Sequence, residues 1–135
     1  MDDPNAIAEL EGIPEAARSL WARLVTEAPK PVPELVKQVH DYQRNLARRS
    51  EWHDENIDPK LARALIDRAL KLLGTIGPDT ADRTRRLVQA AVRYLVIEDD
   101  ATNDLGSILG LDDDAEVMNA VLRELGRESW QVKTR

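Results

Sequence analysis

Apolar residues recur every three to four positions along most of the chain, which is the spacing of an amphipathic helix. This periodicity predicts helices over residues 14–28, 33–50, 59–73, 78–97 and 113–125. The helix expected at 78–97 has the broadest apolar stripe, so it belongs in the centre of a bundle. No stretch has a convincing strand pattern. We therefore expect an all-α fold, a small bundle of four to five helices with an acidic C-terminal helical hairpin.

Prolines and glycines mark the expected helix boundaries. Residues 28–33, APKPVP, cannot be helical, because proline lacks a backbone N–H and pushes the preceding residue into an extended conformation. Pro59 and Pro78 are each expected in the first turn of a helix, where the missing N–H costs nothing. Gly74 and Gly126 are expected to end their helices in the left-handed conformation. The stiff connector after the first helix is thus the best internal boundary.

The length indicates one domain over residues 1–135. We expect the N-terminal helix and its connector in residues 1–30, a helical core over 33–126 and a polar tail over 127–135. Trp130 in this tail is able to fold back on the bundle. The sequence leaves open whether the first helix packs on its own bundle or exchanges between chains.

Composition limits the classes of function. Hydrophobic residues make up 42% of the chain and charged residues 33%, which is ordinary for a globular protein. The absence of cysteine excludes disulfides, thiolate metal sites and thiol nucleophiles. No apolar run is long enough for an integral membrane segment, and MDDPNAIAEL lacks a signal-peptide pattern, so we expect a cytoplasmic protein. A net charge of −6 argues against nucleic acid as the main partner.

The negative charge is concentrated near the C-terminus. Residues 94–122 contain eight Asp and Glu and no Lys or Arg, which leaves −6 − (−8) = +2 for the rest of the chain. One acidic group, 112–116, is expected to start the last helix, with Asp113 as N-cap and Glu116 as its capping-box partner. The other group, 98–100, falls at the C-terminal end of a helix, where the helix dipole disfavours negative charge. It requires a basic neighbour such as Arg93 or Arg63, a bound cation or a partner.

Carboxylates in this number are the ligands that Ca²⁺ or Mg²⁺ requires. The spacing does not fit a calcium-binding EF-hand loop, because Leu105 and Leu111 stand where that loop needs Gly and Glu. The alternative is a looser metal site. Its four candidate ligands are Asp100, Asp104, Asp113 and Asp114.

Other catalytic patterns are missing. The sequence has no phosphate-binding glycine loop, no GxGxxG, no GxSxG and no HExxH. We interpret His40 and His53 as surface or boundary residues, and the alternative of a metal cluster at residues 53–55 rests on tight spacing alone. The arginines near residues 44–49 and 83–86 are expected to form helix salt bridges on solvated faces. We therefore expect no catalytic residues.

The C-terminal third resembles the YkvA-like domain of unknown function over residues 91–125. The matching positions are Tyr94, Leu95, Val96, Asp100, Asp104, Leu109, Gly110, Asp113 and Asp114. The resemblance implies a helical hairpin whose aspartates matter to the turn, and it implies no particular activity. Glu98, Asn103 and Ser107 stand where the family has prolines, and the segment is more polar than the family's, which does not favour membrane attachment.

Taken together, the sequence favours a non-enzymatic, cytoplasmic helical protein that acts by binding another protein or itself. Its acidic hairpin would be the distinguishing surface. The alternative is a divalent-cation-binding domain, structural or hydrolytic, that uses Asp100, Asp104, Asp113 and Asp114.

Overall fold

Helices form all the regular structure in the part of the chain that the computed structural model describes, which is residues 9–51, 59–101 and 107–133. The elements in order are η1 (Glu15–Ala17), α2 (Arg18–Leu24), α3 (Val32–Glu51), α4 (Pro59–Gly74), α5 (Asp82–Ala101), α6 (Ser107–Glu124) and η2 (Glu128–Trp130), where η denotes a short 3-10 helix. The all-α prediction is confirmed. No described helix is both long and apolar enough to cross a membrane.

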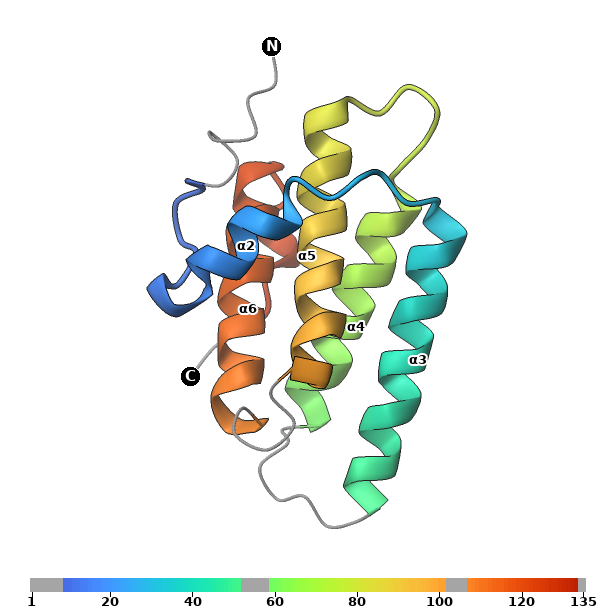
Figure 1. The fold of residues 1–135 in the computed structure, drawn as a ribbon, viewed down its shortest axis with the longest axis vertical. Coiled ribbons are helices and arrows are strands. Elements are labelled where there is room, and N and C mark those ends of the chain that lie inside the picture. Colours follow the sequence, from blue (N-terminus) through green and yellow to red (C-terminus); the bar gives the residue numbers. More distant parts are fainter. Residues whose placement is uncertain (1–8, 52–58, 102–106, 134–135) are drawn as a thin grey trace.

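The four long helices, α3 to α6, run side by side, and the shorter α2 lies across α5 and α6 (Figure 1). α5 packs against each of the other four α-helices. Eight of its apolar residues are buried: Leu87, Val88, Ala90, Ala91, Val92, Tyr94, Leu95 and Val96. The prediction that this helix occupies the centre of the bundle is therefore confirmed.

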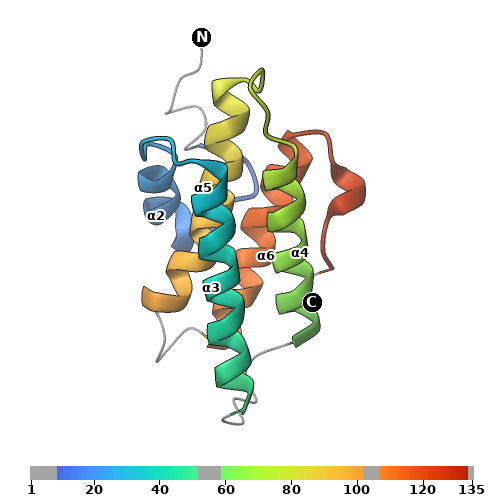
Figure 2. The ribbon, with the colours of Figure 1, turned by 90° about the vertical axis from the view of Figure 1, so that its right-hand side faces the viewer.

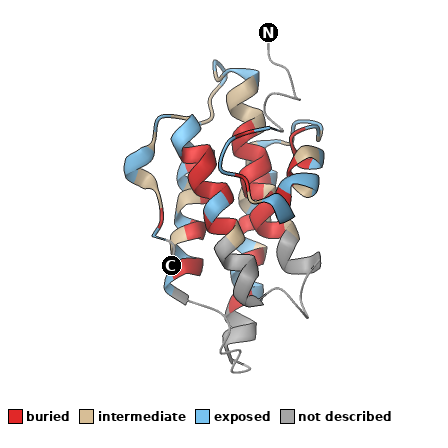
Figure 3. Ribbon diagram, turned by 90° about the vertical axis from the view of Figure 1, so that its left-hand side faces the viewer, coloured by how far each residue is buried: buried red, intermediate tan, exposed pale blue. Residues whose placement is uncertain are grey.

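Each α-helix contributes one apolar face to the core. Buried residues line the inward faces of the helices, and exposed residues face outward (Figure 3). Trp21 of α2 is fully buried, with 0% of its surface exposed, so it is a packing residue as its sequence context suggests. The first helical segment therefore packs on its own bundle.

The N-terminal segment differs from the single helix expected at 14–28. It forms η1 and then α2, which ends at Leu24. The carbonyls that follow are bonded to α5 instead of continuing the helix: Arg86 Nη1 donates to the Val25 carbonyl at 3.1 Å, and Gln89 Nε2 donates to the Ala28 carbonyl at 2.9 Å. Pro29 has no N–H for the Val25 carbonyl to accept, so Arg86 supplies the hydrogen bond that a longer helix would have made.

The start of α5 also differs from the prediction. Pro78 is not in the first helical turn, because α5 begins at Asp82. Pro78 instead follows Gly77 in a turn closed by a 3.1 Å hydrogen bond from the Thr80 N–H to the Gly77 carbonyl. Proline is favoured at this second position of a β-turn. Arg85 fixes the same turn by donating from Nη2 to the Gly77 carbonyl at 2.6 Å.

Glycine ends one helix as expected and not the other. Gly126 has φ +75°, and the Arg127 N–H bonds to the Leu122 carbonyl at 2.7 Å while the Gly126 N–H bonds to the Arg123 carbonyl at 3.1 Å. This is the Schellman arrangement. Gly74 is the last residue of α4 and does not adopt a positive φ, so its predicted left-handed cap is wrong.

The C-terminal tail folds back along α4 (Figure 2). Asn119 of α6 holds it with two hydrogen bonds: Nδ2 donates to the Val132 carbonyl at 2.9 Å, and Oδ1 accepts from the Val132 N–H at 2.8 Å. Trp130 packs against the core, as the sequence allowed. The tail is thus part of the folded unit.

Candidate functional site

The acidic residues that end the fourth predicted helix do lie at a helix C-terminus. α5 extends to Ala101, so residues 98–100 form part of its last turn, which contains no basic residue. Negative charge at this position meets the negative end of the helix dipole. Their charge therefore still calls for a neutralising partner.

The second acidic group is placed differently from the prediction. α6 begins at Ser107, so Asp113 is an interior residue of the helix and its predicted N-cap and capping box are wrong. The helix includes Gly110, which precedes the start predicted at residue 113. One glycine costs a helix only about 1 kcal/mol, and packing of the following turns can offset that cost. Asp114 is buried, at 5% exposure, and Asp113 is half-buried.

The four carboxylates proposed as metal ligands are not all described. Asp113 and Asp114 lie in α6, whereas Asp104 and the side chain of Asp100 lie outside the described residues. Among the side chains that the structure does describe, no three His, Asp or Glu groups come together in a way that could hold a metal ion. The cation site therefore stays a prediction.

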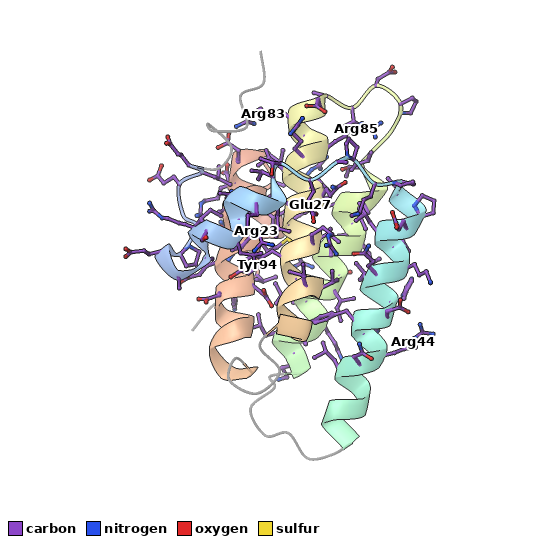
Figure 4. The ribbon with its side chains drawn as sticks, in the orientation of Figure 1. Arg23, Glu27, Arg44, Arg83, Arg85 and Tyr94 are labelled. Carbon is purple, nitrogen blue, oxygen red and sulfur yellow. The ribbon has the colours of Figure 1, made fainter. Side chains whose placement is uncertain are left out.

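Arg93 was one candidate for the basic neighbour of residues 98–100, and it is bonded elsewhere. Its Nε and Nη2 donate to the two carboxylate oxygens of Glu27 at 3.0 and 3.2 Å. Its Nη1 donates to Gln38 Oε1 at 2.9 Å. Figure 4 shows Glu27 next to α5, in the segment that follows α2. Arg93 thus ties the N-terminal segment and α3 to α5. The other candidate, Arg63, is exposed on α4.

Next to the Arg93–Glu27 ion pair, α3 and α5 form an open pocket of about 190 Å³. α3 contributes one helical face, since its lining residues are spaced by three, four and seven positions. α5 contributes a similar face that includes Arg93. The lining residues are Gln38, Asp41, Tyr42, Asn45, Arg93, Val96 and Ile97.

The pocket has an apolar base and polar groups around it. Val96 is buried and Ile97 half-buried, while Gln38, Asp41 and Asn45 offer amide and carboxylate groups. Its two charged side chains already have partners. Arg93 binds Glu27, and Asp41 accepts a hydrogen bond from Arg44, which lies on the outer side of α3 in Figure 4. The pocket is therefore polar at its rim but close to neutral.

The other candidate residues show no catalytic arrangement among the described side chains. His40 is exposed on α3, and His53 lies outside the described residues. The expected helix salt bridges are confirmed at Arg44–Asp41 and at Arg86–Asp82, where the Nε–Oδ2 distance is 2.7 Å. Exposed pairs of this kind contribute little to stability. The prediction is wrong for Arg83, which pairs with Glu124 of α6 at 2.6 Å, and for Arg85, which binds backbone carbonyls.

Sequence reasoning missed this pocket. Its signal is the single charged residue inside an otherwise apolar run: Arg93 interrupts the sequence AAVRYLVI. A polar position on the inward side of a central helix requires a partner, because an unpaired charge is costly to bury. That partner, Glu27, is 66 positions away, so no local pattern reveals it.

Comparison of the chain with protein-family models, with curated proteins and with solved structures gave no match. The resemblance of residues 91–125 to YkvA-like domains therefore stays a prediction.

Proposed function

We propose that the protein is a non-enzymatic binding module that recognises another protein through the α3–α5 pocket. The observation that supports this most directly is the size of the pocket, about 190 Å³. Sites for small molecules and cofactors usually measure about 300–1,000 Å³. A space of roughly 150 Å³ is enough for a benzene-sized group. The pocket thus suits one inserted side chain better than a whole cofactor.

The lining indicates which kind of side chain would enter. Val96 and Tyr42 present apolar surface, whereas Gln38 and Asn45 present amide groups and Asp41 a carboxylate. A side chain with an apolar body and a polar end, such as Tyr or Arg, satisfies both. These residue types also dominate the energetically important positions of protein interfaces.

Selection of peptides against the protein tests this proposal. A phage-displayed library of random twelve-residue peptides is selected on the wild-type protein, and the affinities of the selected peptides are measured by fluorescence anisotropy. Asn45→Arg fills the pocket from an exposed position, and Gln43→Arg makes the same chemical change on the same helix away from it. We expect Tyr- or Arg-containing peptides that bind Asn45→Arg at least tenfold more weakly and Gln43→Arg unchanged. Selected peptides that bind both variants equally well would show that the pocket is not the site.

The second candidate function is divalent-cation binding by Asp100, Asp104, Asp113 and Asp114. It is supported by the acidic last turn of α5, which has no basic residue of its own. A cation that binds only the folded state at one hundred times its Kd adds about 2.7 kcal/mol to the free energy of unfolding. Thermal melts with 5 mM Ca²⁺, Mg²⁺ or Mn²⁺ should then show a rise in Tm that Asp100→Asn/Asp104→Asn abolishes. An unchanged Tm with all three metals would exclude this function.

A further inference from the structure

α4 and the tail beside it carry a positive charge on a protein that is otherwise acidic. Residues 59–74 and 127–133 contain six basic and two acidic residues, a charge of 6 − 2 = +4. The remaining residues of the chain then sum to −6 − 4 = −10. We call the basic residues the cationic strip. They are Lys60, Arg63, Arg68, Lys71, Arg127 and Lys133.

Trp130 organises the centre of the cationic strip. The Arg127 guanidinium carbon lies 4.5 Å from the centre of the Trp130 ring, and Lys71 Nζ lies 5.5 Å from it. Both distances fall within the range of cation–π attraction. Arg68 Nε donates a hydrogen bond to the Trp130 carbonyl. One residue of the tail thus holds three cations from α4 and the tail close together.

This positive charge is only partly balanced by the two acidic residues of the same segments, Asp67 and Glu128. Asp67 contacts Arg68 and also Lys71, whose Nζ lies 3.6 Å from Asp67 Oδ2, so one carboxylate serves two cations. Lys71 remains about half exposed. Lys60, Arg63 and Lys133 are exposed as well. Figure 2 shows the tail running beside α4, and the contacts of Arg68 and Lys71 with Trp130 join the two segments.

We infer that the cationic strip binds an acidic segment of a protein partner. Carboxylates form strong, charge-assisted hydrogen bonds with arginine. At physiological salt, charges interact strongly only within about 8 Å. A short acidic segment bound to the strip is therefore attracted by its basic residues and is little repelled by the acidic remainder of the molecule. A long polyanion such as nucleic acid extends into that remainder and is repelled. Stacked bases are also disfavoured, because cations already lie over the Trp130 ring. The cationic strip shares no residue with the α3–α5 pocket, so this inference does not rest on the proposed function.

Binding of a labelled acidic peptide tests the inference. The probe is a fluorescein-labelled peptide of six Glu alternating with Gly, and the reference peptide has Gln in place of Glu. Anisotropy is measured with the full chain at 50 and 300 mM NaCl. We expect the Glu peptide to bind at low salt and to bind several-fold more weakly at high salt, and we expect no binding of the Gln peptide. Equal binding of both peptides, or none of either, would overturn the inference.

Charge-reversal variants locate the binding. Lys71→Glu/Arg127→Glu should weaken binding of the Glu peptide by roughly tenfold or more. The control Arg18→Glu/Lys37→Glu makes the same total change in charge at exposed positions of α2 and α3 and should leave the affinity within about twofold. Because the first pair touches Trp130, Arg63→Glu/Lys133→Glu provides a second test at positions that leave the ring contacts intact. An equal loss in the control would show that only the overall charge matters, and the inference would fail.

Two further probes separate the possible occupants. A labelled ten-residue thymidine strand should bind at least tenfold more weakly than the Glu peptide, and tighter binding would overturn the assignment to an acidic protein segment. Sedimentation of the protein alone at 50 mM NaCl shows whether a second copy provides that segment. Salt-sensitive dimers that are lost in Lys71→Glu/Arg127→Glu would support the inference and identify the partner as the chain itself.

Discussion

Gln89 is the residue whose loss should most clearly loosen the connector between α2 and α3 from α5. It is buried in α5, where its Nε2 donates to the Ala28 carbonyl at 2.9 Å and its Oε1 accepts from the Lys30 N–H at 2.8 Å. Gln89→Leu keeps a similar volume and removes both hydrogen bonds. Each buried backbone group left without a partner costs about 1–3 kcal/mol. Since the connector is only partly buried, we expect a total loss of about 2–3 kcal/mol in the free energy of unfolding.

Urea denaturation followed by circular dichroism measures this loss, and hydrogen exchange of the Lys30 amide reports on the connector itself. Gln43→Leu is the matched control, because it makes the same change at an exposed position of α3. It should alter the free energy of unfolding by less than about 0.5 kcal/mol. If Gln89→Leu is as stable as this control and the Lys30 amide stays protected, then Gln89 does not hold the connector.

Three further substitutions test other contacts. Asn119→Leu removes both hydrogen bonds to Val132, so the tail should detach and the free energy of unfolding should fall by about 2–4 kcal/mol in urea denaturation. The detached tail should be cleaved faster by a protease, and an undigested tail would contradict this. Gly126→Ala forces a side chain into a backbone with φ +75° and should cost about 1 kcal/mol by thermal melting, whereas no change would argue against the left-handed cap. Gly12→Ala should lower the stability more than Gly126→Ala in the same assay, because residue 12 has φ +96° and the new Cβ would also meet Ala120 Cβ at 3.2 Å and the Arg123 guanidinium. A smaller loss for Gly12→Ala than for Gly126→Ala would refute the contact.

The long helices could be predicted from the sequence because their apolar periods are local signals. α3 and α4 begin and end within about one residue of the ranges expected from periodicity and proline. One of the boundaries that were wrong involves distant groups. α2 ends where Arg86 and Gln89 bind the following carbonyls, and these partners are 61 positions away. The start of α6 was missed because Asp113 and Glu116 have the spacing of an N-cap and its capping-box partner, although they lie inside the helix.

The candidate site was predictable only in part, for the same reason. The acidic charge at the end of α5 can be read directly from residues 98–100. The pocket needs the alignment of Gln38 and Asn45 with Arg93, which exists only when α3 lies beside α5. The cationic strip likewise needs the tail to return to α4. A tail of mixed polar residues gives no sign of that contact except Trp130 itself.

α5 links the N-terminal segment to the proposed binding pocket. Arg86, Gln89 and Arg93 recur at helical spacing on one of its faces, and each binds the segment between α2 and α3. The third of them is also a wall of the pocket. Glu27 binds two of the Arg93 nitrogens and balances their charge, so the loss of Glu27 would leave an unbalanced positive charge in the pocket wall. The N-terminal segment therefore does more than cover the core, because it sets the electrostatic character of the site that we propose for partner binding.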